Sequence, residues 1–233
     1  MTTGFQIAID GPVAAGKSSV ARELARTTGF VYVDTGAMYR AVTLMAIRNE
    51  IELSDEDALS QLVRRIEIYV RSPEGDEKDG RLSTVLVDGE DVSWEIREAK
   101  ISAVVAEVAS KPRVREVLVP VQRRIALGKD VVMEGRDITY IVLPDAELKI
   151  YLSAREDVRV ERYHSMLVNK NKDVTHDYAR KILRERDELD ATREASPLRI
   201  VPGAWELDTS ELTIKGVVEK IVQRIEEIKE EEK

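Results

Sequence analysis

A glycine-rich turn close to the start of the chain constrains the fold more than any other segment. Before it, the apolar run 6–9 ends at Asp10 and has the character of a buried strand, and after it residues 17–27 have helical spacing. A strand, a turn of this pattern and a helix, in that order, form a phosphate-binding loop. The turn matches the pattern G-x-x-x-x-G-K-[ST] and continues by one residue, reading Gly11-Pro12-Val13-Ala14-Ala15-Gly16-Lys17-Ser18-Ser19.

The chemistry of this turn predicts that it binds the phosphates of a nucleoside triphosphate. Its backbone N–H groups point inward, and the start of the following helix adds partial positive charge. The Lys17 ammonium is placed to reach the β- and γ-phosphates, and the Ser18 hydroxyl is placed to ligate Mg²⁺. The alternative is a turn that carries a lysine by chance, and the strand and helix on either side argue against it.

The order of elements predicts an α/β protein with a P-loop three-layer fold and a central parallel sheet. The chain opens with a strand, a helix, a second strand at 31–33 and a second helix at 37–49, which is typical of right-handed crossovers between parallel strands. We expect further strands at 131–133, 148–152 and 206–209, and further helices at 95–110, 112–127 and 214–228.

Two segments interrupt this pattern. Residues 66–71 and 83–87 alternate like antiparallel strands around the acidic loop 73–79, and Asp88-Gly89 marks a turn after them. Residues 156–168 and 175–194 are helical and dense in charge. We therefore expect one insert near 66–100 and a second, helical one near 155–190.

Composition excludes several classes of function. The 36 basic and 44 acidic residues give a net charge of −8, so a general partnership with nucleic acid or an anionic membrane is not expected. The chain has no cysteine, which excludes disulfides, thiolate metal sites and cysteine nucleophiles. It also lacks a long apolar run, and we expect a cytoplasmic protein that acts as a monomer.

Arginines gather where an anionic second substrate would bind. The expected buried strand at 131–133 ends in Glu134, a candidate Mg²⁺ ligand, and Arg136 follows almost at once. Arg40 stands just after the second strand, in the segment 34–40. On the last charged helix the residues Arg186, Asp190 and Arg193 share one face, and Arg155, Arg159 and Arg162 repeat this spacing on the helix before it.

Several enzymes and non-enzymes share such a loop. A GTPase needs Asn-Lys-x-Asp to read guanine, and the segment 169–172 has lysine where the aspartate is required. A phosphate monoester is largely dianionic at neutral pH, so as an acceptor it needs arginines and no general base. Asp34 and Asp137 keep a hydroxyl acceptor possible. A kinase of UMP, AMP or shikimate, or a protein that uses ATP only as a switch, remain alternatives.

The motifs taken together resemble bacterial cytidylate kinase, a P-loop nucleoside monophosphate kinase, over essentially the whole chain. They stand in family order, namely Gly11–Ser19, Asp34-Thr35-Gly36-Ala37-Met38-Tyr39-Arg40, Gly89-Glu90-Asp91-Val92-Ser93, Pro112-Arg113-Val114-Arg115, Gly135-Arg136-Asp137-Ile138, Pro144-Asp145-Ala146, Glu185-Arg186-Asp187 with Asp190 and Arg193, Ser196-Pro197-Leu198 and Asp208-Thr209-Ser210.

The resemblance implies an enzyme of pyrimidine metabolism that transfers the γ-phosphate of ATP, with Mg²⁺, to CMP or dCMP. It implies one kinase domain over 1–233, with a core at about 1–65, 101–154 and 195–233. An NMP-binding insert would lie at about 66–100 and a mobile helical lid at about 155–194.

Site roles are also implied by position. Arg40, Arg136 and Arg193 would hold the CMP phosphate, and Arg186 would join them when the lid closes. The remaining roles fall to residues of the same cleft: the lid arginine Arg162, the nucleotide neighbours Asp34, Thr35 and Tyr39, the ribose ligand Asp190, and the base readers Arg115 and Asp137. An arginine fork suits the acceptors O2 and N3 of cytosine, and a carboxylate suits its amino group. Uracil would leave these groups mispaired. Without the family, Arg115 would be an exposed helix arginine and Asp137 the ion-pair partner of Arg136.

The chain departs from the family at three places. Ala106 stands where a serine is usual, Thr139-Tyr140 replaces a Gly-Thr pair, and Arg162-Tyr163 replaces an arginine pair. These changes concern the strength of CMP preference and the contacts of the lid. Outside the site, we expect Trp94 and Trp205 to anchor packing, and His164 and His176 to be surface residues, with 170–172 as a solvated lid tip.

Overall fold

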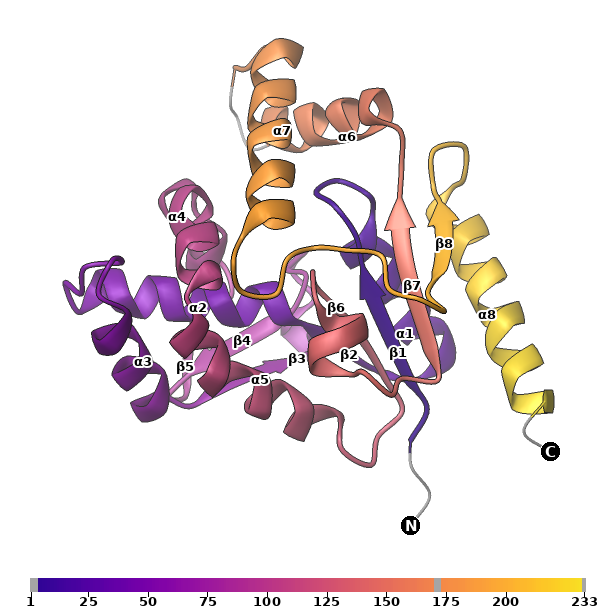
Figure 1. Cartoon of the computed structure of the whole chain (residues 1–233), viewed down its shortest axis with the longest axis horizontal. Coiled ribbons are helices and arrows are strands. Elements are labelled where there is room, and N and C mark those ends of the chain that lie inside the picture. Colours follow the sequence, from indigo (N-terminus) through magenta and orange to yellow (C-terminus); the bar gives the residue numbers. More distant parts are fainter. Residues whose placement is uncertain (1–3, 170–172, 232–233) are drawn as a thin grey trace.

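A five-stranded parallel sheet forms the centre of the protein (Figure 1), whose computed structural model describes residues 4–169 and 173–231. The strands lie in the order β2-β6-β1-β7-β8, and each pairing is parallel. Their bounds are β1 (Gln6–Asp10), β2 (Val31–Asp34), β6 (Val131–Glu134), β7 (Leu148–Ser153) and β8 (Trp205–Asp208). The predicted α/β fold with a central parallel sheet is confirmed.

Helices cover both faces of this sheet, and the alternation of side chains along β1 shows why. Ile7 and Ile9 pack into a core shared with α1 and α8, whereas Ala8 faces the opposite core, which α5 completes. A strand that is buried on both faces reads as a continuous apolar run, as this one does. The helices are α1 (Lys17–Thr28), α2 (Thr35–Arg48), α3 (Glu56–Arg65), α4 (Ala99–Ser110), α5 (Pro112–Ala126), α6 (Glu156–Val168), α7 (His176–Thr192) and α8 (Ile214–Glu231).

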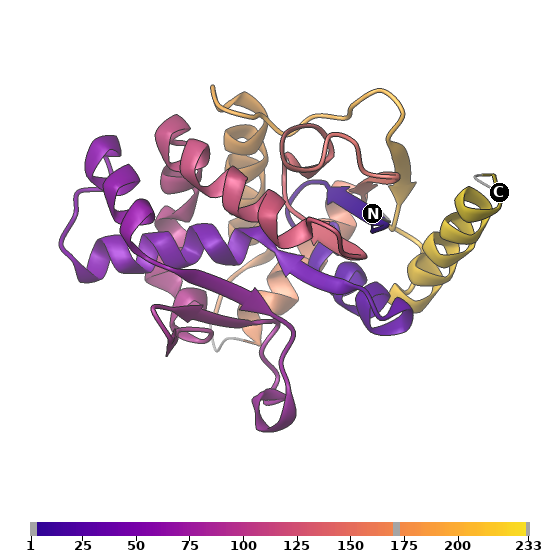
Figure 2. The same ribbon diagram turned by 90° about the horizontal axis from the view of Figure 1, so that it is seen from below.

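A second, antiparallel sheet forms within the segment expected to be an insert. It consists of β3 (Ile68–Arg71), β4 (Thr84–Val87) and β5 (Glu90–Asp91). Asp88 and Gly89 both have positive φ, 50° and 85°, which is the geometry that a tight hairpin turn requires. The buried side chains of this sheet share one apolar core with α2, α3, α4 and α5. Figure 2 shows the hairpin and its protruding loop below these helices.

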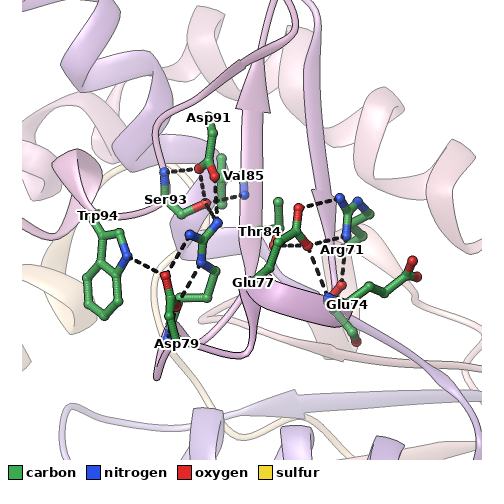
Figure 3. A network of polar contacts seen from close by, with 11 residues as sticks. Arg71, Glu74, Glu77, Asp79, Thr84, Val85, Asp91, Ser93 and Trp94 are labelled. Carbon is green, nitrogen blue, oxygen red and sulfur yellow. Dashed lines mark hydrogen bonds and ion pairs between the residues drawn. The ribbon is translucent and has the colours of Figure 1, made fainter.

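Ion pairs close the long loop between β3 and β4 (Figure 3). Arg71 donates to both carboxylate oxygens of Glu77 at 2.6 and 2.7 Å, and the Thr84 hydroxyl donates to the same carboxylate at 2.9 Å. Arg81 bridges Asp79 and Asp91 in the same way. These contacts give an acidic, solvated loop a defined conformation without an apolar core of its own.

The two tryptophans differ from each other in their surroundings. Trp205 is half-buried and packs against the core of the central sheet, as predicted. The prediction for Trp94 is wrong, because 54% of this residue is exposed and its indole Nε1 donates to Asp79 at 3.0 Å. Ile96, two residues further on, is fully buried and takes the packing role instead.

The helices α6 and α7 form a pair above the carboxyl end of β7 (Figure 1). They join through a small apolar cluster that includes Tyr163 and Leu167 from α6 and Leu183 from α7. Val13 of the phosphate-binding loop belongs to the same cluster, so this helix pair rests directly on that loop. The expected solvated tip at 170–172 lies outside the described residues.

Some local structure differs from the sequence expectations. Helix α3 was not expected, although Asp55 caps it by accepting a hydrogen bond from the Ala58 N–H at 2.9 Å. Helix α4 begins at Ala99, later than predicted, because the extended backbone of Glu98 separates it from a short 3₁₀ turn at Glu95–Arg97 (η2). A wide π-type turn, η3 (Ile138–Val142), begins four residues after the end of β6 at Glu134. Within 4–169 and 173–231, every helix is too short or too polar to cross a bilayer.

Truncating Ile96 should cost far more stability than truncating Trp94. Ile96→Ala leaves a cavity in a closed core and should lower the free energy of unfolding by about 2–5 kcal/mol. Trp94→Ala removes an exposed ring with one hydrogen bond and should cost less than about 1.5 kcal/mol. Urea unfolding followed by far-UV circular dichroism compares the two variants. Equal losses would contradict the packing described for this segment.

Candidate active site

The predicted site residues meet in one cleft of about 660 Å³, where the carboxyl ends of β1, β2 and β6 face α6 and α7. Gly11 and Pro12 lead into it from β1. The other site residues line it, namely Val13, Ala14, Ala15, Gly16, Lys17, Ser18, Ser19, Asp34, Thr35, Tyr39, Arg40, Arg115, Glu134, Arg136, Asp137, Arg162, Arg186, Asp190 and Arg193. In open α/β sheets this edge is where ligands bind.

The phosphate-binding loop needs glycine at its first position for a steric reason. The loop leaves β1 beside β7, and a Cβ atom on Gly11 would lie 2.1 Å from the Leu152 carbonyl oxygen. At its end, Gly16 has φ 98° and caps α1, so the first N–H groups of the helix open toward the cleft. The sequence Lys17–Thr28 then runs as a helix that stops at Gly29, whose φ is 77°.

Lys17 is buried at the base of the loop and is poorly able to keep its charge without an anion. Its Nζ donates to the Pro12 carbonyl at 2.8 Å. Burial, together with the nearby Arg136 guanidinium, lowers the pKa of Lys17 from 10.5 to about 7. A bound polyphosphate would supply the missing negative charge.

Two buried carboxylates, Asp34 and Glu134, stand beside each other at the ends of β2 and β6. They are direct partners in the strand register. Burial and the charge of Asp34 raise the pKa of Glu134, and the Tyr32 hydroxyl donates to it at 3.0 Å. Burial alone would raise the pKa of Asp34, but the Arg97 guanidinium, 2.6 Å away, outweighs that effect and lowers it. Paired acids with a neighbouring Ser18 hydroxyl offer the oxygen ligands that Mg²⁺ prefers.

Guanidinium groups crowd the wall of the cleft beside these acids. Arg40 donates to the Ile96 carbonyl at 3.2 Å and to the Ser102 hydroxyl at 2.8 Å. Burial, and the charges of Arg97 and Arg186, lower the pKa of Arg40 to about 10. Several cations held this close together form a strong field for an anion.

Two further arginines of this wall are held by partners on or after α7. Arg136 Nε donates to Asp190 at 2.6 Å, and Arg193 Nε donates to the Ser196 carbonyl at 2.7 Å. Arg193 Nη2 is a buried donor that has no hydrogen-bond partner among the described residues. Buried donors are normally paired, so this one indicates a ligand that completes the site.

Arg115 and Asp137 form a buried ion pair at the far end of the cleft. Arg115 also donates to the Ala109 carbonyl at 2.9 Å and to the Ser196 hydroxyl at 3.2 Å. The interpretations of Arg115 as an exposed arginine and of Asp137 as the partner of Arg136 are both wrong. Tyr39 is buried and its ring lies 5.3 Å from the Arg115 guanidinium, so it belongs both to the core and to the cleft wall.

The turn that carries Arg136 and Asp137 is fixed by hydrogen bonds of Asp10, Thr139 and Tyr140. Asp10 accepts hydrogen bonds from the backbone N–H groups of Ile138 and Thr139, each at 2.9 Å, and from the Thr139 hydroxyl at 2.7 Å. The Tyr140 hydroxyl donates to the Pro197 carbonyl at 2.5 Å. Thr139 and Tyr140 therefore tie this turn to β1 on one side and to the segment after α7 on the other.

Helix α6 contributes one arginine near the phosphate-binding loop. Arg162 donates to the Thr209 hydroxyl at 3.0 Å and to its carbonyl at 2.8 Å. The same hydroxyl donates to the Ala15 carbonyl at 3.0 Å. Arg162 therefore lies on the loop side of the cleft, while its neighbour Tyr163 packs into the apolar cluster between α6 and α7.

Sequence reasoning missed three residues that shape the cleft. Arg97 lines it and pairs with Asp34, and Thr209 links β8 to the phosphate-binding loop. Asp10 is fully buried and organises the turn after β6. The only signal for Asp10 was a carboxylate at the end of an apolar strand, and Arg97 had no periodic pattern that set it apart.

Fold and site together define a P-loop phosphotransferase with an arginine-lined acceptor wall. A family model described as cytidylate kinase matches residues 7–227. The chain belongs to the cytidylate kinase family.

Curated cytidylate kinases match this chain in sequence over nearly its full length. The chain is 46% identical to the cytidylate kinase of Caldanaerobacter subterraneus subsp. tengcongensis over 220 residues, which is 94% of each chain. It is 41% identical to that of Bacillus subtilis, over 97% of this chain and 99% of the relative. An uncharacterized protein from Eubacterium ventriosum shares the fold at 10% identity, with a TM-score of 0.53 over 96% of this chain and 98% of its own.

Binding of ATP should take up a proton through Lys17. With a pKa of about 7, only about a tenth of Lys17 is charged at pH 8, and the phosphates should restore the charge. Titration calorimetry at pH 8 in two buffers of different ionisation enthalpy should show uptake approaching one proton, and much less at pH 6. Lys17→Arg is the control, because arginine is charged throughout. The same uptake in both proteins would contradict the assignment.

Proposed function

We propose that the protein transfers the γ-phosphate of ATP to CMP or dCMP, giving ADP and CDP or dCDP. The single observation that carries this proposal is one cleft that joins a phosphate-binding loop, an arginine wall and a buried Arg115–Asp137 pair. Membership of the cytidylate kinase family makes the enzyme an ATP-dependent phosphotransferase that acts on nucleotides. The choice of base and the roles of individual residues rest on the arguments below.

At the donor end, the loop residues 11–19 would bind the ATP phosphates through their N–H groups, and Lys17 would neutralise the β- and γ-phosphates. Ser18 and Glu134 would hold Mg²⁺, and Glu134 fits such an ion because burial and the charge of Asp34 raise its pKa, an effect that a neighbouring cation would offset. When bound, Mg²⁺ offsets charge on the phosphates. Arg162, next to the loop through Thr209, would add positive charge on the same side.

At the acceptor end, Arg40, Arg136 and Arg193 would hold the phosphate of CMP, and Arg186 would complete the set. The attacking group is already a dianion at neutral pH, so the residues have to position it and reduce its repulsion from ATP. Unlike a general base, a guanidinium does both. Together with Lys17 and Arg162, Arg136, Arg186 and Arg193 would be the catalytic residues.

The ribose and base would occupy the far end of the cleft. Asp190, now paired with Arg136, would accept a hydrogen bond from a ribose hydroxyl. Arg115 would donate to O2 and N3 of cytosine, and Asp137 would accept from its amino group. Asp34, Thr35 and Tyr39 would line the same chamber. Ala106 lines it as well and supplies no hydroxyl, so we expect one contact to the base fewer than a serine would give.

We further propose that the chain is one kinase domain with three parts, of which the lid is mobile. The core would comprise about 1–65, 101–154 and 195–233, the NMP-binding insert about 66–100 and the lid about 155–194. We expect a monomer to be the active unit. Since ATP and CMP are its substrates, the cytoplasm is the compartment in which we expect it to act.

A coupled assay of ADP release tests this function. With ATP and Mg²⁺, CMP and dCMP should each stimulate ADP formation far above UMP, AMP, GMP and shikimate, and Lys17→Ala should abolish turnover with every acceptor. Faster reaction with UMP or AMP would overturn the base assignment. If no acceptor stimulated ADP formation, the alternative of a non-catalytic ATP switch would replace the kinase.

Exchanging one atom at Asp137 should move the base preference toward uracil. Asp137→Asn replaces an acceptor oxygen by an N–H donor, which suits the uracil carbonyl and opposes the cytosine amino group. The ratio of kcat/KM for CMP to that for UMP should fall at least about tenfold. Asp145→Asn, an exposed carboxylate in the following loop, is the matched control and should leave this ratio unchanged. An unchanged ratio in Asp137→Asn would remove Asp137 from base recognition.

A further inference from the structure

The two histidines of the chain lie in contact with each other on the helix pair α6–α7, outside the cleft. His164 is on α6, one turn after Glu161, and His176 is the first residue of α7. Their rings stack with centroids 3.7 Å apart and planes inclined by 18°. One ligand atom from each of Glu161, His164 and His176 lies within 4.8 Å of the others. A chain with two histidines in 233 residues has brought both to one carboxylate.

The hydrogen bonds of these groups leave them able to bind a metal ion. His176 Nε2 lies 2.8 Å from Glu161 Oε2 and donates a hydrogen bond to this carboxylate. His164 Nε2 lies 2.9 Å from the Val174 carbonyl oxygen, which can only accept. In a neutral His164 ring, Nε2 therefore carries the proton and Nδ1 carries the lone pair. A histidine that donates one ring N–H to a carbonyl and keeps the other nitrogen for a metal is the usual arrangement of a ligand.

We propose that a divalent transition-metal cation binds to Glu161, His164 and His176. Zinc is the ion that we expect there. Two imidazoles and a carboxylate are the ligands that such ions prefer, and a fourth, open position would hold water. The ion would replace the proton between His176 and Glu161, whose atoms need to separate by only about 0.5 Å for bonds of about 2 Å to one ion. One ring must also turn out of the stack. His176 can do this because its side chain is 55% exposed.

This site differs from the proposed Mg²⁺ site in position and chemistry. Mg²⁺ prefers oxygen ligands in octahedral geometry, which Ser18, Glu134 and phosphates offer inside the cleft. The histidine site lies on the helix pair itself and prefers ions that bind nitrogen ligands. An ion there would connect the helix that carries Arg162 to the helix that carries Arg186. It would therefore stabilise the helix pair as a unit without touching substrate.

Zinc binding measured directly tests the proposal. The full chain, free of nucleotide and in excess Mg²⁺, is titrated with ZnCl₂ by calorimetry, and one equivalent should bind. His164→Gln and His176→Gln should each weaken binding at least about tenfold, which is the smallest loss typical of an altered metal site. Gln can donate to Glu161 at position 176 and to the Val174 carbonyl at position 164, so these substitutions separate ligation from hydrogen bonding and packing. Asp177→Asn, an exposed acid next to His176, is the matched control and should bind zinc like the wild type.

Two further measurements use the same proteins. Zinc should raise the midpoint of thermal unfolding of the wild type and of Asp177→Asn, and leave that of His176→Gln unchanged. Co²⁺ should give visible absorption bands of a nitrogen-ligated ion that disappear in both histidine variants. The proposal is overturned if the wild type takes up no zinc, or if the histidine variants bind it as the wild type does, since the ion would then sit elsewhere. Activity is not the readout, because zinc also binds nucleotide phosphates.

Discussion

Repulsion between buried guanidinium groups is the constraint around which the cleft is built. Arg40, Arg97 and Arg186 lie close enough for the latter two to depress the pKa of the first. Such a cluster would be costly to bury unless carboxylates offset it. The fold supplies three such carboxylates: Asp34 pairs with Arg97, Asp190 with Arg136 and Asp137 with Arg115. The cleft thus holds its positive charge together with carboxylate partners.

The carboxylates come from different layers of the molecule, so the cleft depends on the whole fold. Asp34 ends a strand of the central sheet and also caps α2, Asp137 follows β6, and Asp190 belongs to α7. The turn after β6 connects the central sheet to the segment after α7. Asp10 holds it from below through Thr139, and Tyr140 holds the segment after α7 against it. Thr139 and Tyr140 both make these contacts through their side-chain hydroxyls.

The sequence predicted those features of the structure that depend on residues close together in the chain. The phosphate-binding loop, its strand and its helix follow from residues 6–27 alone, and the structure has them within one residue of the prediction. The resemblance to a family brought Arg115 and Asp137 to the same site, where they form an ion pair. Arg97 could not be found this way, because its partner Asp34 is 63 residues away and no periodicity marks it. Trp94 misled for the related reason that composition alone does not tell which of two neighbouring apolar residues faces the core.

The hydroxyl of Thr209 has a consequence for the order in which the molecule can be completed during translation. It donates to the carbonyl of Ala15 across 194 residues, and β1 itself lies between β6 and β7. A contact of the phosphate-binding loop therefore waits for a residue that is made 194 positions later. Contacts of such long sequence separation form slowly. The strand β1 therefore has no partner until β6 and β7 have been made, and the bond from Thr209 that ties down the phosphate-binding loop forms later still.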